Sequence, residues 1–266
     1  MPVTKLKVSH RMIEPKCTLS EIFSSYQGEG LLLGQHQIFV RFSGCNLSCS
    51  YCDTTSSQVS SGDFKIFWPK RNSSVLQNNP IGTAELNEIL SKFIELGDRY
   101  HSISCTGGEP LEQADFLAHW LAKYPPDLPI HLETNGTLPD RLSKVIDYVD
   151  WIGMDIKLPS VSNGEDGKSS GVFWDQTKTF LKIASCQKVF VKIVISGQID
   201  YEEIRRAAYL VASIDSTIPI FLQPVTVNNK EFYFDGGGIV KSMEICRGIL
   251  RNVSVLPQMH KTLGFH

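Results

Sequence analysis

Short apolar runs rich in β-branched residues alternate along the chain with longer segments whose apolar positions recur at helical spacing. The short runs predict strands at 37–42, 102–105, 130–133, 151–156, 189–195, 218–222 and 253–256. The longer segments predict helices at 83–96, 112–123, 139–148, 174–184, 201–212 and 239–251. Because strands that alternate with helices form parallel sheets covered by helices, we expect an α/β fold whose parallel strands form a partial (β/α) barrel.

Two stretches interrupt this alternation. Residues 56–80 are rich in Ser and Asn, and residues 160–170 are polar and rich in Gly and Ser. Such composition is typical of surface insertions. Three roles are open for residues 56–80: a cover over the functional site, a contact with a partner, or a loop without function. We predict one domain over residues 1–266, with insertions at 56–80 and 160–170.

Composition narrows the class of protein. With 266 residues, 42% of them hydrophobic, the chain can bury a full core. The net charge of −2, without a block of Lys and Arg, argues against nucleic-acid binding. We expect no membrane span and no signal peptide, and therefore a cytoplasmic protein whose seven cysteines stay reduced.

Three of those cysteines, Cys45, Cys49 and Cys52, lie in one short loop. Three thiolates are one short of the four that close a structural zinc site or fully ligate a cubane cluster, so a four-iron cluster here would keep one iron open. Zinc with a distant fourth ligand, a disulfide plus one odd thiol, and chance clustering are the alternatives. The spacing resembles the Cys-x3-Cys-x2-Cys signature of the radical S-adenosylmethionine (SAM) superfamily, in which the open iron binds and cleaves SAM.

Polar or glycine-rich residues follow five of the predicted strands. They are the cysteine loop and the segments Thr106-Gly-Gly-Glu-Pro110, Glu133-Thr-Asn-Gly136, Asp155-Ile-Lys157 and Gln223-Pro-Val-Thr226. Ligands of parallel α/β folds bind at the carboxyl ends of strands, so one shared site explains all five better than five unrelated turns. Gly107 and Gly108 let the backbone approach a ligand, and Glu109 can accept hydrogen bonds from an ammonium group. The alternative for the segment 106–110 is a simple turn before a helix, and the alternative for Asp155 and Lys157 is an exposed ion pair.

Residues 21–30 contain Gln27 and Glu29 between glycines. We interpret this segment as a flexible polar loop that suits the edge of a heterocycle, with a solvated turn as the alternative. In the strand that follows, Gln37 and Arg41 share one face of the predicted sheet. An Arg that points into a barrel needs a partner, and a bound carboxylate is a natural one.

Together, Gln27-Gly-Glu-Gly30, Phe39-Val-Arg41, the loop from Gly44 to Thr54 and Leu256-Pro-Gln-Met-His-Lys261 closely resemble the 7-carboxy-7-deazaguanine synthase family of radical SAM enzymes. The resemblance implies the radical SAM fold and a ring contraction of 6-carboxy-5,6,7,8-tetrahydropterin with release of ammonia. It also implies a single [4Fe–4S] cluster on Cys45, Cys49 and Cys52, SAM, and Mg²⁺ on Thr54. A reducing partner such as flavodoxin or ferredoxin and a homodimer follow from the same resemblance.

The resemblance assigns two sets of contacts. SAM contacts Tyr51, Cys52, Asp53, Gly108, Asp155, Ile156, Lys157, Gln223, Pro224, Val225 and Thr226. The pterin contacts Tyr26, Gln27, Gly28, Glu29, Arg41 and Thr106. For His260, a site residue and a surface residue are the alternatives, and we favour the second.

Two other functions are alternatives. A glycyl-radical-enzyme activating protein shares the cysteine signature but acts on a protein, and Gln27, Glu29 and Arg41 favour a small carboxylated substrate. A zinc-stabilised binding protein would hold zinc on the three cysteines and would not cleave SAM.

Overall fold

The structure is a computed structural model that describes residues 14–265 except 72, 98, 126, 163–173, 198, 228–230 and 233–235. Its centre is a 10-stranded sheet with the order β14-β11-β10-β9-β8-β7-β3-β2-β4-β5. The strands are β2 (Leu19–Tyr26), β3 (His36–Phe42), β4 (Asp63–Phe67), β5 (Ser74–Asn78), β7 (Ser102–Gly107), β8 (Ile130–Thr134), β9 (Trp151–Asp155), β10 (Lys188–Ile195), β11 (Ile220–Pro224) and β14 (Val253–Val255). All neighbours from β3 to β14 are parallel, and among the described residues the two ends of the sheet do not pair with each other. The predicted partial (β/α) barrel is confirmed.

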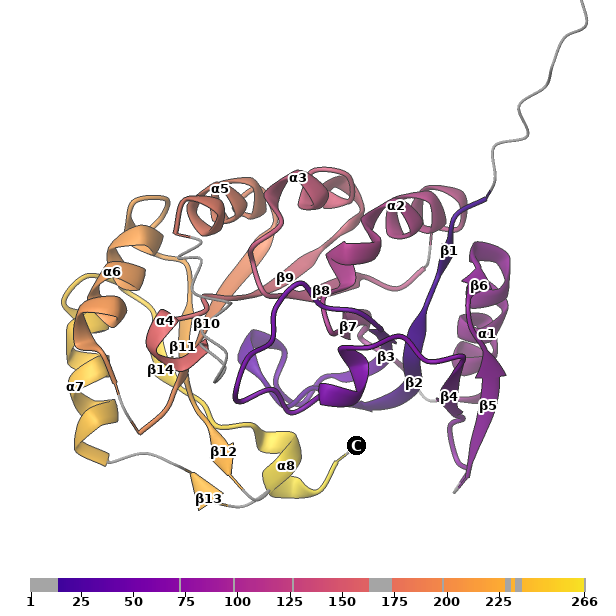
Figure 1. The fold of residues 1–266 in the computed structure, drawn as a ribbon, viewed down its shortest axis with the longest axis horizontal. Helices are drawn as coiled ribbons and strands as arrows, with labels where there is room; N and C mark the ends of the chain where they lie inside the picture. The colour runs from indigo at the N-terminus through magenta and orange to yellow at the C-terminus, as the bar shows by residue number, and fades with distance from the viewer. Residues whose placement is uncertain are drawn as a thin grey trace, which may run out of the picture.

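Helices cover the outer face of this curved sheet (Figure 1). They are α1 (Thr83–Leu96), α2 (Ala114–Lys123), α3 (Pro139–Leu142), α5 (Trp174–Ala184), α6 (Tyr201–Ala212) and α7 (Gly236–Arg247). Shorter elements are α4 (Pro159–Ser162), α8 (Met259–Leu263), the strand pairs β1 (Lys16–Cys17) with β6 (Ile81–Gly82) and β12 (Thr226–Val227) with β13 (Glu231–Phe232), and the 3₁₀ turns η1 (Gly30–Leu32), η2 (Thr55–Ser57), η3 (Pro110–Gln113) and η4 (Ile146–Tyr148). None of the described helices has the length and apolar composition needed to span a bilayer.

Most predicted elements appear close to their expected limits, and the exceptions have local causes. The helix expected at 139–148 is interrupted: α3 ends at Leu142, and η4 follows through i→i−3 bonds such as Val145 N–H to the Leu142 carbonyl. The helix expected from 112 begins as the tighter turn η3, because the Glu109 carboxylate accepts the Leu111 N–H.

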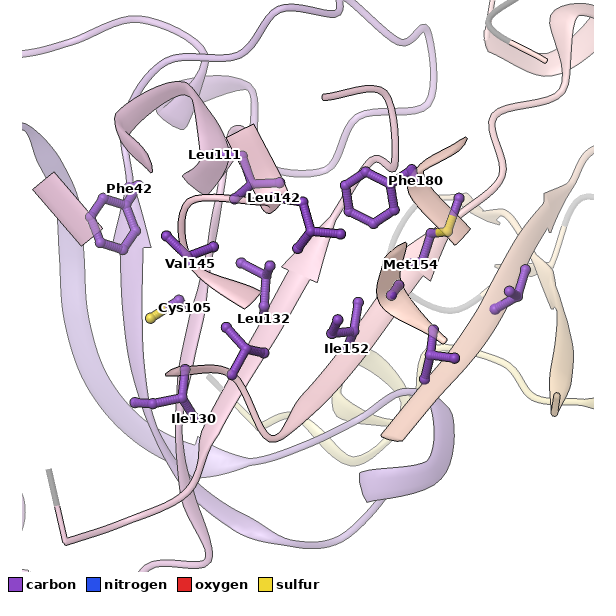
Figure 2. Close-up of a cluster of buried hydrophobic side chains, with 14 of the residues drawn as sticks. Phe42, Cys105, Leu111, Ile130, Leu132, Leu142, Val145, Ile152, Met154 and Phe180 are labelled. Atoms are coloured by element: carbon purple, nitrogen blue, oxygen red, sulfur yellow. The ribbon is translucent and has the colours of Figure 1, made fainter. Parts of the chain in front are cut away.

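The two faces of the sheet differ in chemistry. Apolar side chains of alternate strand positions point outward to the helices and form the core shown in Figure 2, among them Leu132, Ile152 and Met154. The other face carries buried polar residues that include Gln37, Ser102, Ser104, His131 and Lys192. Burying polar groups is costly unless they are paired, so this inner face is not a second apolar core.

Two regions predicted as loops are strands. Residues 19–26 form β2, which pairs antiparallel with β3, so the flexible loop expected from residue 21 begins only after Tyr26. Residues 56–80 contain the antiparallel pair β4 and β5, and β4 adds to β2 in the main sheet. Phe64 and Ile66 are buried while Lys65 between them is exposed, which anchors the pair to the core. The stretch expected at 160–170 lies mostly outside the described residues.

Candidate active site

A cavity of about 220 Å³ opens on the inner face of the sheet, at the carboxyl ends of the parallel strands. Its walls contain every residue predicted to bind SAM, pterin, cluster or Mg²⁺, except Ile156. These are Tyr26, Gln27, Gly28, Glu29, Arg41, Cys45, Cys49, Tyr51, Cys52, Asp53, Thr54, Thr106, Gly108, Asp155, Lys157, Gln223, Pro224, Val225 and Thr226. The Ile156 side chain is buried in the core instead, and its N–H donates to the Lys192 carbonyl at 2.9 Å. The strand-end segments therefore meet at one place.

The cysteine loop forms one wall of the cavity. Cys45, Cys49 and Cys52 are free thiols of intermediate burial, and all three face this space. The Leu47 N–H donates to the Cys45 sulfur at 3.4 Å, and the Thr54 hydroxyl lies 3.8 Å from the Cys52 sulfur. Burial raises the pKa of Cys45 to about 11, so the thiol stays protonated unless a metal centre replaces its proton.

These residues fit a cluster better than a single ion. In the part of the chain that the structure describes, no three His, Cys, Asp or Glu side chains are gathered to hold one metal ion. A cubane cluster takes each cysteine on a different iron, so its ligands surround a larger object. Three cysteines around one cavity, with a backbone N–H on one sulfur, match that requirement.

The segment Thr106–Pro110 packs directly on the start of the cysteine loop. Gly108 N–H donates to the Phe42 carbonyl at 3.0 Å, and Glu109 N–H donates to the Gly44 carbonyl at 2.7 Å. A Cβ on Gly108 would lie 2.1 Å from the Gly44 oxygen. The glycine therefore allows two backbone segments to touch each other, besides facing the cavity.

The side chain of Glu109 is hydrogen-bonded within the chain. It is completely buried, does not line the cavity, and accepts the Asn135 N–H at 2.7 Å and the Thr134 hydroxyl at 2.9 Å. Burial raises its pKa to about 7, although these hydrogen bonds lower it. The chain itself supplies donors to this carboxylate, and its contact with an ammonium ligand stays a prediction.

A charged cluster crosses the floor of the cavity. The ammonium of Lys192, from β10, lies 2.5 Å from Glu29, 3.4 Å from Asp155 and 4.0 Å from Glu133. Asp155 also pairs with Lys157 at 2.8 Å. Burial alone would raise the pKa of Asp155, but the two ammonium groups outweigh it and lower that pKa. The pair Asp155–Lys157 is thus partly buried and networked, and the alternative of an exposed ion pair is wrong.

Hydrogen bonds hold the loop of Gln27 and Glu29 over this cluster. The Gln27 amide donates to Glu133 at 3.1 Å and to Gln37 at 3.1 Å. The Glu29 carboxylate accepts from Gln258 at 2.9 Å and from Gln223 at 3.2 Å. These contacts fix the two polar residues whose amide and carboxylate face the cavity.

The C-terminal segment closes one side of the cavity. Met259 N–H donates to the Gly28 carbonyl at 3.0 Å, and a Cβ on Gly28 would lie 2.3 Å from the His260 ring. Gln258 and Lys261 both reach Asp53, at 2.8 and 2.7 Å. His260 lines the cavity, so its interpretation as a surface residue is wrong.

Sequence reasoning did not assign a site role to several residues that the structure brings there, including Phe23, Phe39, Lys192 and Gln258. Lys192 carried a usable signal, because it is the single charge between apolar residues of one buried strand. Gln258 carried none in isolation, because only the fold of the C-terminal segment brings it to Glu29.

The chain is similar in sequence to proteins of known family. A profile of the Radical SAM superfamily matches residues 39–211. A Geobacter sulfurreducens protein named 7-carboxy-7-deazaguanine synthase is 38% identical over 95% of this chain and 99% of its own length. This chain belongs to that family. A Methanopyrus kandleri member is 32% identical over 94% of this chain and 95% of its own length.

Solved structures support the fold of this radical SAM family member. QueE from Escherichia coli superposes with a TM-score of 0.51 at 17% identity, covering 90% of this chain and 93% of that one. A radical SAM methyltransferase from Sphaerobacter thermophilus gives a TM-score of 0.56 at 14% identity, over 90% of this chain and 77% of that one. At these identities the likeness concerns the fold alone.

Proposed function

We propose that this chain converts 6-carboxy-5,6,7,8-tetrahydropterin to 7-carboxy-7-deazaguanine with release of ammonia. The observation that carries the proposal is the single cavity, in which the three cysteines and the residues expected for SAM and pterin face one another. The curated relatives carry the name of that activity at up to 38% identity. The product is a precursor of modified deazapurines such as queuosine.

The cofactors have distinct places in this proposal. Cys45, Cys49 and Cys52 hold the [4Fe–4S] cluster, which, when bound, supplies the electron that cleaves SAM to a 5′-deoxyadenosyl radical. Tyr51, Asp53, Gly108 and the segments 155–157 and 223–226 hold SAM. Thr54, beside Cys52, offers a hydroxyl oxygen to Mg²⁺, a hard cation that completes its shell with substrate oxygens and water.

The chain's own task is to orient the pterin and to exclude water. Gln27 and Glu29 present an amide and a carboxylate to the heterocycle edge, Arg41 takes the carboxylate, and Tyr26, Gly28 and Thr106 complete the contacts. The buried ammonium of Lys192 pairs with the Glu29 carboxylate and holds it in place. A flavodoxin or ferredoxin as reductant, a homodimer and a cytoplasmic location remain part of the proposal.

The test is anaerobic reconstitution with iron and sulfide, followed by SAM, Mg²⁺, reductant and 6-carboxy-5,6,7,8-tetrahydropterin. Mass spectrometry follows 5′-deoxyadenosine and 7-carboxy-7-deazaguanine. We expect the product from the wild type and not from Cys45→Ala, whereas Cys186→Ala, an exposed thiol outside the cavity, should match the wild type. SAM cleavage without deazaguanine would point to an activating protein, and absence of iron and of cleavage would return the cysteines to zinc.

A further inference from the structure

The inner face of β2 and β3 carries a layer formed by Glu21, Arg41 and Phe23. Glu21 and Arg41 are direct partners across the antiparallel pair, and Thr106 of β7 lies on the other side of Arg41 in register. Arg41, Phe23 and Thr106 line the cavity, but Glu21 does not. Glu21 can therefore act on a ligand in the cavity through Arg41.

The contact between the two side chains is specific. The Nε–H of Arg41 donates to Glu21 Oε1 at 2.7 Å, with only 17% and 20% of the two side chains exposed. The guanidinium also lies over the Phe23 ring, with its central carbon 5.4 Å from the ring centroid. One edge and one face of the guanidinium are thus fixed by the chain.

An Arg side chain has five N–H donors in a rigid planar fork, four of them on its two terminal nitrogens. Among the described residues, the hydrogen bond of this guanidinium is the one from Nε to Glu21. The terminal nitrogens are the pair that grips a carboxylate with two parallel hydrogen bonds. Since Nε is already taken, a ligand carboxylate meets the fork end-on.

We infer that Glu21 is a positioning residue that holds Arg41 ready for a carboxylate, so that the chain selects a carboxylated pterin over one without that group. The inference rests on the proposed function. Held by Glu21 and Phe23, the Arg41 fork loses little further freedom when the ligand binds, which is the source of the selectivity.

The opposite effect is physically possible and gives the inference a clear test. Glu21 also neutralises part of the charge of Arg41, so if it only competed with the ligand, its removal would tighten carboxylate binding. If it positions the fork, its removal weakens binding of the carboxylated pterin alone.

The experiment uses the reconstituted holoenzyme with SAM bound, under anaerobic conditions. Dissociation constants are measured for 6-carboxy-5,6,7,8-tetrahydropterin and for 5,6,7,8-tetrahydropterin, which lacks the carboxylate. We expect Glu21→Ala to raise the first constant about tenfold and Glu21→Gln to raise it less, because the Gln oxygen still accepts the Nε–H without charge. The second constant should change by less than about twofold.

The matched control is Glu202→Gln, which removes another Glu–Arg pair, on the exposed surface of α6. Tighter binding of the carboxylated pterin by Glu21→Ala, or equal weakening for both pterins, overturns the positioning role. Wild-type holoenzyme that cleaves SAM but binds neither pterin overturns the proposed function, and this inference with it. Unchanged selectivity in Glu21→Ala overturns the inference alone.

Discussion

At the scale of single residues, the buried ammonium of Lys192 compensates the negative charge of three carboxylates around it. Its ammonium serves Glu29, Glu133 and Asp155, and only 8% of its side chain is exposed. Breaking a buried ion pair by removing one partner costs about 3–5 kcal/mol, because the other charge stays buried without compensation. The fold therefore depends on the charges that form the floor of the cavity.

We expect Lys192→Met to lower the free energy of unfolding by about 3 kcal/mol at pH 7. Without the ammonium, which lowers the pKa values of Glu133 and Asp155, these two pKa values rise in the folded state. Folding then takes up protons, and the deficit shrinks as the pH falls toward 5. Urea unfolding at both pH values measures this. Lys188→Met, on an exposed position of the same strand, is the control. A deficit of the same size at both pH values would mean that lost packing, not charge, is the cause.

His131 gives a second prediction, in a separate pH window. Burial lowers its pKa from 6.5 to about 4, and its Nε2 has no hydrogen-bond partner in the described structure. Between pH 6.5 and 4 the unfolded chain binds the proton that the folded chain refuses, so this residue stabilises the fold at neutral pH and less as the pH falls. Glu109, with its raised pKa, acts in the opposite direction over pH 7 to 4.5.

Because the two effects oppose each other, the wild-type pH profile alone does not isolate His131. We expect the stability of His131→Gln relative to the wild type to improve by about 2 kcal/mol between pH 7 and pH 5. Urea unfolding followed by circular dichroism gives the difference. A constant difference between the two proteins over this range would show that His131 has the same pKa in the folded and unfolded chains.

At the scale of elements, the segment after β7 and the cysteine loop form one unit through backbone contacts. The Cβ of an Ala at position 108 would lie 2.1 Å from the Gly44 oxygen, so the cysteine loop must shift. Overpacking of this kind costs about 1–3 kcal/mol, and a displacement of about 1 Å at a reacting centre can cost about 100-fold in rate.

We therefore expect Gly108→Ala to bind less iron on reconstitution and to cleave SAM at least about tenfold more slowly. Gly62→Ala is the matched control, because a Cβ there meets nothing within 4 Å. Iron content per chain and the initial rate of 5′-deoxyadenosine formation are the measurements. Normal iron and a normal rate in Gly108→Ala would show that the cysteine loop yields without losing its geometry.

Some strands and helices could be predicted from the sequence alone, and others could not. The parallel strands from β3 to β14 and helix α1 follow from apolar runs and helical spacing, which are local signals. β2 was missed because Ser and Glu residues interrupt its apolar positions, so no apolar run marks it. The pair β4 and β5 was missed because a polar composition hid the alternation of Phe64, Lys65 and Ile66.

At the scale of the whole molecule, the site depends on pairings between distant parts of the chain. The strand-end rule predicted that the five motifs meet, since it depends only on parallel topology. It did not predict Gln258 or His260, because they reach the cavity through a segment that crosses the open side of the barrel after the last strand (Figure 1). No local pattern specifies a contact between residue 258 and residue 29.

That crossing segment gives the last prediction. Gln258 joins the loop of Glu29 to the cysteine loop at Asp53, with donor–acceptor distances of 2.9 and 2.8 Å. Hydrogen bonds to charged groups contribute about 1.5–3 kcal/mol each, so their loss should loosen α8 and the loop that it covers. We expect Gln258→Leu to raise the KM for the pterin about tenfold and to speed hydrogen exchange at the Met259 amide, which donates to Gly28. Leu263→Ala, an exposed residue at the end of the same helix, should change neither. Faster exchange without a change in KM would mean that the segment covers the cavity but does not position its loops.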